Sequence, residues 1–165
     1  MRLETSVRVL VVDDFEPWRD YVRSTLRKNS QFNVIGEGTD GEEAVRRAKE
    51  TQPDLVLLDL ALPKLNGIAA LRRIRELSPK SKVLLMSVEQ SSDVVDEALR
   101  CGAAGYVVKH DAANDLLLAL EAILQNRQFV SRSVNGKDPG EPAHDFRMNV
   151  EESPSLLPKS IEGRA

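Results

Sequence analysis

Five short apolar segments alternate with amphipathic segments up to about Phe129, and this alternation constrains the fold more than any other feature of the sequence. The apolar segments cover residues 7–12, 32–35, 55–58, 83–86 and 106–108. Most are rich in β-branched residues and almost continuously apolar, which is typical of strands whose two faces are both covered. Residues 32–35 are more polar, as edge strands often are.

Each apolar segment is followed by apolar residues at three- and four-residue steps, which predict one helix per strand. The residues that carry this periodicity are Trp18, Tyr21, Val22, Thr25 and Leu26, then Ala44, Val45 and Ala48, then Ile68, Leu71 and Ile74, then Val94, Val95, Ala98 and Leu99, and finally Leu116, Leu117, Leu120, Ile123 and Leu124. Thr39 to Glu42 fit a capping box, and Asn66 can cap the third helix. Five such units with right-handed crossovers predict an α/β, doubly wound (βα)5 sandwich with a parallel sheet of order 2-1-3-4-5.

Four of the five predicted strand ends carry groups that can handle phosphate or a divalent metal. Asp13 and Asp14 follow the first strand, Asp59 ends the third, Ser87 the fourth and Lys109 the fifth. The carboxyl ends of parallel strands face one crevice, so we expect these side chains to converge. Two unit charges ~4 Å apart repel by roughly 4 kcal/mol at a protein-like dielectric, so three carboxylates predict a bound cation. Oxygen ligands with open positions suit Mg²⁺ or Mn²⁺, which also bind phosphate oxygens.

An aspartate in such a site can attack phosphorus if nearby positive groups neutralise the charge that gathers on the phosphoryl oxygens. Asp59 is the predicted nucleophile, because Asp13 and Asp14 adjoin each other and can share the metal. Lys109 adds a fixed positive charge, and the Ser87 hydroxyl can donate a hydrogen bond to a phosphoryl oxygen. Periodicity alone does not establish which carboxylate reacts.

Together these residues resemble the response-regulator receiver domain of two-component signalling, of the type often joined to a helix-turn-helix output domain. The resemblance runs from about Val7 to Phe129. The residues that carry it are Asp13, Asp14, Asp59 with the following Leu60, Ala61, Leu62 and Pro63, Gly67, Ser87, Gly102, Ala103, Tyr106 and Lys109. It implies a flavodoxin-like fold for this part of the chain.

The resemblance also implies roles for individual residues. Asp59 would accept a phosphoryl group from a histidine kinase or phosphotransfer protein, with Ser87 and Lys109 contacting the phosphate. Asp13, Asp14, Asp59 and the backbone carbonyl of Ala61 would bind Mg²⁺. Tyr106 would move with Ser87, and the face formed by the fourth helix, fifth strand and fifth helix would then signal to a downstream protein target. His110 stands where many receivers have proline, which leaves the placement of Lys109 open.

The periodicity ends near Ser131, which predicts a receiver domain over residues 6–130 and a flexible tail rich in proline, glycine and acidic residues over 131–165, with no recognisable output domain. Half of the eight prolines lie in this last stretch. No pair of basic amphipathic helices follows Ser131 and the net charge is −3, so we expect no direct contact with nucleic acid. Neither a signal peptide nor a membrane span is predicted, which favours a cytoplasmic protein. A homodimer is possible, and the sequence does not decide the oligomeric state.

Two alternatives from other functional classes remain. Residues 36–41 match G-x-G-x-x-G, which would indicate a nucleotide-binding Rossmann-like enzyme. The glycines, however, follow the second strand, and Asp13 and Asp14 occupy the first turn, where they would repel a pyrophosphate. The other alternative is a pseudo-receiver that binds proteins without being phosphorylated. The favoured interpretation is a signalling domain that is not an enzyme, with only self-directed phosphotransfer and autodephosphorylation.

Overall fold

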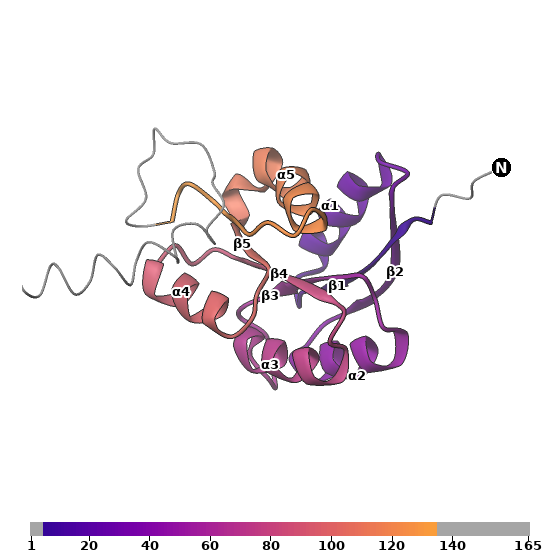
Figure 1. The fold of residues 1–165 in the computed structure, drawn as a ribbon, viewed down its shortest axis with the longest axis horizontal. Coiled ribbons are helices and arrows are strands. Elements are labelled where there is room, and N and C mark those ends of the chain that lie inside the picture. The colour runs from indigo at the N-terminus through magenta and orange to yellow at the C-terminus, as the bar shows by residue number, and fades with distance from the viewer. Residues whose placement is uncertain (1–4, 135–165) are drawn as a thin grey trace, which may run out of the picture.

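A parallel sheet of six strands forms the centre of the computed structural model, which describes residues 5–134 (Figure 1). The strand order is β2-β1-β3-β4-β5-β6, so the predicted order of the first five strands is confirmed. The strands are β1 (Val7–Val12), β2 (Phe32–Gly38), β3 (Leu55–Asp59), β4 (Lys82–Ser87), β5 (Gly105–Val108) and β6 (Phe129–Val130).

Helices cover both faces of the sheet (Figure 1). They are α1 (Glu16–Arg27), α2 (Gly41–Thr51), α3 (Gly67–Leu77), α4 (Ser92–Arg100) and α5 (Ala112–Leu124), with a short 3₁₀ turn, η1 (Lys109–Asp111), before α5. In β1, Val9 and Val11 pack in the apolar cluster with α1 and α5, whereas Leu10 and Val12 pack in the cluster with α2, α3 and α4. Successive side chains of a strand point to opposite faces, so covering both faces makes the strand continuously apolar.

The capping groups at α2 differ by one residue from the prediction. Asp40 is the N-cap, and its carboxylate accepts a hydrogen bond of 2.8 Å from the backbone N–H of Glu43. Glu43, rather than Glu42, closes the box by accepting from the Thr39 N–H at 2.7 Å. The predicted cap of α3 is present, since Asn66 accepts from the Ala69 N–H at 2.9 Å.

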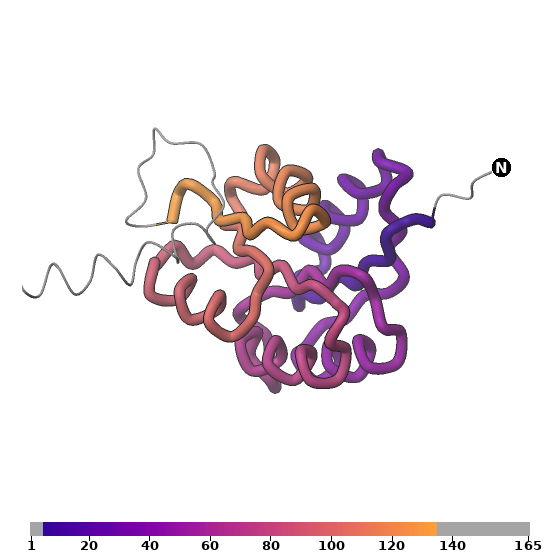
Figure 2. The backbone as a smooth tube through the Cα atoms, viewed as in Figure 1, coloured from indigo at the N-terminus to yellow at the C-terminus, as the bar shows by residue number. Residues whose placement is uncertain are grey.

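Packing continues four residues past the expected domain boundary at residue 130. Strand β6 pairs in parallel with β5, and the chain after it lies beside β5 and α5 (Figure 2). Ser131 is fully buried and Val134 nearly so. The Ser131 hydroxyl accepts from the Val108 N–H at 3.0 Å and donates to the Asp115 carboxylate at 2.8 Å. The packed unit therefore extends at least to Val134, and the rest of the expected tail, residues 135–165, lies outside the described part of the chain.

Within residues 5–134, no helix is both long and apolar enough to cross a lipid bilayer.

Candidate phosphoryl and metal site

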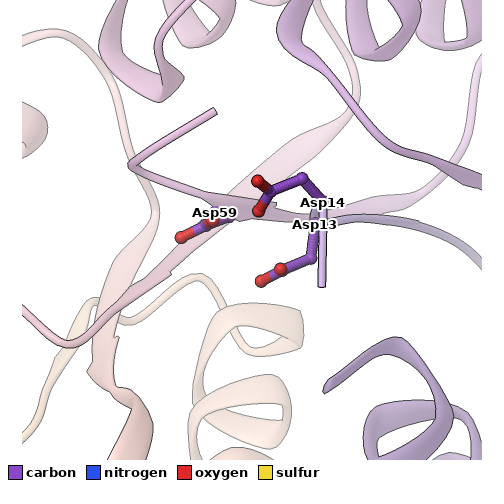
Figure 3. A group of neighbouring side chains, drawn as sticks. All are labelled: Asp13, Asp14 and Asp59. Atoms are coloured by element: carbon purple, nitrogen blue, oxygen red, sulfur yellow. The ribbon is translucent and has the colours of Figure 1, made fainter. Parts of the chain in front are cut away.

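The carboxyl ends of β1 and β3 bring Asp13, Asp14 and Asp59 together (Figure 3). The two strands are hydrogen-bonded neighbours, with Val12 in register with Leu58, so the residues that follow emerge side by side. One carboxylate oxygen of each aspartate lies within 4.8 Å of the others. Asp13 and Asp59 are buried, whereas Asp14 is exposed. The expected convergence of three acids is thus present, with one of them open to solvent.

Lys109 reaches this acidic cluster from the end of β5. Its ammonium lies 2.6 Å from Asp13 Oδ2 and 3.5 Å from Asp59 Oδ1. The other oxygen of Asp13 accepts a hydrogen bond from the Phe15 N–H at 2.9 Å. None of the peptide bonds between the described residues is cis, and the peptide before His110 is therefore trans. Lys109 reaches the site with His110 in the place that many receivers give to proline.

The electrostatic environment of Asp59 disfavours its charged form. Burial raises the pKa of Asp59 to about 6, and the nearby Asp13 carboxylate acts in the same direction. Lys109 and the Ala61 N–H, which lies 3.4 Å from Asp59 Oδ1, oppose the rise without cancelling it. One ammonium is shared between two buried carboxylates while a third lies beside them. The donor set therefore fits a hard divalent cation, which prefers oxygen ligands.

Close packing of two glycines supports the loop that follows Asp59. A Cβ on Gly67 would lie 2.5 Å from the Asp59 carbonyl oxygen, and one on Gly41 would lie 1.8 Å from the Leu65 carbonyl oxygen. Gly41 also donates its N–H to the Pro63 carbonyl at 3.2 Å. The last glycine of the G-x-G-x-x-G match is thus accounted for by contact with the β3–α3 loop. The motif begins within β2, where Gly36 and Gly38 pair with β1, and ends at the start of α2. Because β2 is an edge strand, the structure gives no support to a Rossmann-like nucleotide site.

Ser87 and Tyr106 meet at the backbone of Glu89. Ser87 is buried at the end of β4, and its hydroxyl accepts from the Glu89 N–H at 3.0 Å. The Tyr106 side chain is fully buried and its hydroxyl donates to the Glu89 carbonyl at 2.8 Å. Burial also raises the pKa of the Tyr106 hydroxyl. Tyr106, which was expected to move with Ser87, is fully buried in this structure.

Two residues of α1 contact the site although their sequence positions indicate only a helix. Arg19 donates to the Asp13 carbonyl at 2.7 Å and forms an ion pair of 2.9 Å with Glu37. The Lys109 ammonium lies 5.1 Å from the centroid of the Trp18 ring. Trp18 falls on the apolar spacing of α1, so the sequence contains no signal that distinguishes it from an ordinary core residue.

The fold and the site define a class of doubly wound domain with a cluster of acidic side chains at the carboxyl ends of its strands. The family model of the response regulator receiver domain matches residues 9–121, and the chain belongs to this family. It is 34% identical over 116 residues to chemotaxis protein CheY of Thermotoga maritima, covering 70% of this chain and 96% of that protein. It is 32% identical over 126 residues to the nitrate/nitrite response regulator NarL of Escherichia coli K12, covering 76% and 58%.

A solved structure supports the same assignment. The LuxR-family two-component response regulator from Aurantimonas sp. SI85-9A1 superposes with a TM-score of 0.72 at 35% identity, over 77% of this chain and 90% of that one. The relatives are response regulators, which are signalling proteins rather than enzymes. The chain spans about half to two thirds of the transcriptional regulators that it matches. Because these relatives are transcriptional regulators, the comparisons give no support to the expectation that this chain makes no direct contact with nucleic acid.

Proposed function

We propose that Asp59 accepts a phosphoryl group from a histidine kinase or phosphotransfer protein. The observation that carries this proposal is the position of the Lys109 ammonium between Asp13 and Asp59, next to a third carboxylate. Asp59 ends its strand with its carboxylate toward the other two acids, whereas Asp13 is held by Lys109 and by the Phe15 N–H. Asp59 is therefore the more weakly held of the two buried acids, since its contacts with the Lys109 ammonium and the Ala61 N–H are 3.5 and 3.4 Å long.

In the proposed reaction, an Asp59 oxygen forms a bond to phosphorus while the bond from phosphorus to the donor breaks, and an acyl phosphate results. Asp13, Asp14, Asp59 and the Ala61 carbonyl would hold Mg²⁺ or Mn²⁺, which supplies positive charge for the phosphoryl oxygens when it is bound. Lys109, whose ammonium lies near both Asp13 and Asp59, stabilises the developing negative charge. The same residues assist hydrolysis of the acyl phosphate, so phosphotransfer and dephosphorylation are both self-directed.

Phosphorylation of Asp59 would change the conformation of the chain outside the site through Ser87. A phosphoryl group adds about −1.5 to −2 charge units and new acceptor oxygens. The Ser87 hydroxyl then donates to a phosphoryl oxygen and gives up its bond with the Glu89 N–H. Because Tyr106 holds the Glu89 carbonyl, this exchange alters the balance between conformations of the chain that leads into α4. A downstream protein target recognises the favoured conformation.

The test is phosphorylation by a small-molecule phosphodonor with Mg²⁺, followed by intact mass spectrometry. We expect one added phosphoryl group on the wild-type chain and none on Asp59→Asn. Glu50→Gln, which changes an exposed carboxylate on α2, is the control and is expected to be labelled like the wild type. Equal labelling of wild type and Asp59→Asn would refute the acceptor assignment. Magnesium binding without labelling of any variant would favour the pseudo-receiver.

A further inference from the structure

The ring of Trp18 faces the Lys109 ammonium, a contact that the proposed function does not use. The ammonium lies 5.1 Å from the ring centroid, and the same nitrogen is 2.6 Å from Asp13 Oδ2 and 3.5 Å from Asp59 Oδ1. The Lys109 side chain is only 17% exposed. Asp13 after β1, Asp59 at the end of β3 and Trp18 on α1 therefore all lie close to one cation.

Attraction between a cation and an aromatic face becomes stronger when the cation is withdrawn from water, and an indole ring provides the strongest form of it. The ring is held on α1, where it lies 5.2 Å from the Tyr21 ring. The indole Nε1 of Trp18 is buried and has no hydrogen-bond partner among the described residues. An unpartnered buried N–H has a cost that phenylalanine would avoid. The stronger attraction of an indole face for a cation gives a reason for tryptophan at this position despite that cost.

Lysine needs such support because its charge sits on a flexible four-carbon chain. In the structure its shortest contact is to Asp13, which is also a proposed metal ligand. If Asp13 were to bind a metal ion, the lysine would lose its shortest contact at the stage when a phosphoryl group would be transferred to Asp59. The Trp18 ring contacts the ammonium without competing for the metal.

We propose that Trp18 is a positioning residue that holds the Lys109 ammonium beside Asp59, and so sets the rate at which Asp59 is phosphorylated. This inference rests on the proposed function of Asp59. Trp18 acts through Lys109 and makes no bond to the phosphoryl group.

The first test detects the contact between the Trp18 ring and the Lys109 side chain directly, and it needs neither phosphate nor metal. In a ¹H–¹³C spectrum of the metal-free protein with labelled lysine, the ring should shift the Hε signals of Lys109 upfield of the other lysines. Lys109→Arg assigns the signal. Trp18→Phe should keep an upfield signal, and Trp18→Leu should lose it. An unshifted Lys109 signal in the wild type, or one unaffected by Trp18→Leu, would overturn the proposal even if Asp59 is not the acceptor.

The second test measures the effect of Trp18 on phosphorylation of Asp59, as the initial rate of labelling with a small phosphodonor at saturating Mg²⁺. Trp18→Leu should slow labelling about tenfold, which corresponds to about 1.4 kcal/mol, and Trp18→Phe should stay within about threefold of the wild type. Thermal unfolding of the two variants separates positioning from loss of fold, and Trp18→Met replaces Trp18→Leu if the latter does not fold. Equal rates for Trp18→Phe and Trp18→Leu would overturn the positioning role. A wild type that is not labelled at all refutes the acceptor assignment, while the spectrum still decides whether Trp18 holds Lys109.

Discussion

Asp59 is buried beside a second carboxylate, and this makes the stability of the fold depend on pH. The pKa of its carboxyl rises from 3.8 to about 6 on folding. Between about pH 4 and pH 6 the folded state therefore keeps a proton that the unfolded state has released. The free energy of unfolding must then fall as the pH rises through this interval, and the loss persists above pH 6.

Removing this charge is expected to stabilise the protein. Without divalent cations, Asp59→Asn should have a free energy of unfolding roughly 2 to 3 kcal/mol above that of the wild type at pH 7, and the difference should vanish near pH 4. Urea unfolding at both pH values measures it. Glu50→Gln is the matched control, because it removes an exposed carboxylate and should change neither value. A free energy of unfolding at pH 7 that is higher for the wild type than for Asp59→Asn would contradict the prediction.

At the scale of elements, the loop between β3 and α3 is supported by direct backbone contact with the start of α2. The Leu65 carbonyl lies against Gly41, and Lys64 pairs with Asp40 at 3.5 Å. This contact leaves no space for a side chain at residue 41. Because the loop begins at Asp59, its position also determines where the Ala61 backbone lies relative to the proposed acceptor.

Gly41→Ala should therefore displace the loop. A Cβ only 1.8 Å from a backbone oxygen cannot be accommodated without movement, and overpacking of this kind costs about 1 to 3 kcal/mol. We expect that loss in urea unfolding, together with weaker Mg²⁺ binding measured by calorimetry. Gly36→Ala is the control from the same motif, since its Cβ would meet the Leu10 side chain at an ordinary 3.6 Å. Equal stability of the two variants would contradict the packing argument.

At the scale of the whole molecule, the alternation of strands and helices could be predicted because burial produces it in the sequence, whereas the strand order was supported by the resemblance to receiver domains. Val9 to Val12 are apolar without interruption because each face of β1 is covered. Parallel strands then place Asp13 and Asp59 at the same carboxyl end of the sheet, however the helices pack. The contribution of Trp18 could not be predicted, because an indole that faces a lysine has the same spacing as one that faces the core.

Strand β6 was not predicted from the sequence, for a different reason. It has only two residues, so it shows no periodicity, and the segment after it is fixed by hydrogen bonds of Ser131 rather than by an apolar pattern. Serine in a stretch rich in polar residues is typical of a loop. Its burial depends on Val108 and Asp115, which are distant in sequence, and only the three-dimensional structure brings these groups together.

The position of the domain boundary can be tested by comparing a chain that ends at Val130 with one that ends at Val134. The shorter chain leaves the Val108 N–H and the Asp115 carboxylate without the Ser131 hydroxyl, and it also loses the buried side chain of Val134. Each buried polar group without a partner costs about 1 to 3 kcal/mol, and burial of a valine contributes about 1.5 kcal/mol or more. We therefore expect the shorter chain to be less stable by roughly 3 kcal/mol or more in urea unfolding.

Ser131→Ala in the full chain should lower the free energy of unfolding by roughly 1 to 3 kcal/mol, since it removes the polar contacts but keeps Val134. The Val108 amide should then exchange faster with deuterium. Equal stability of the two shortened chains would mean that the domain ends at residue 130.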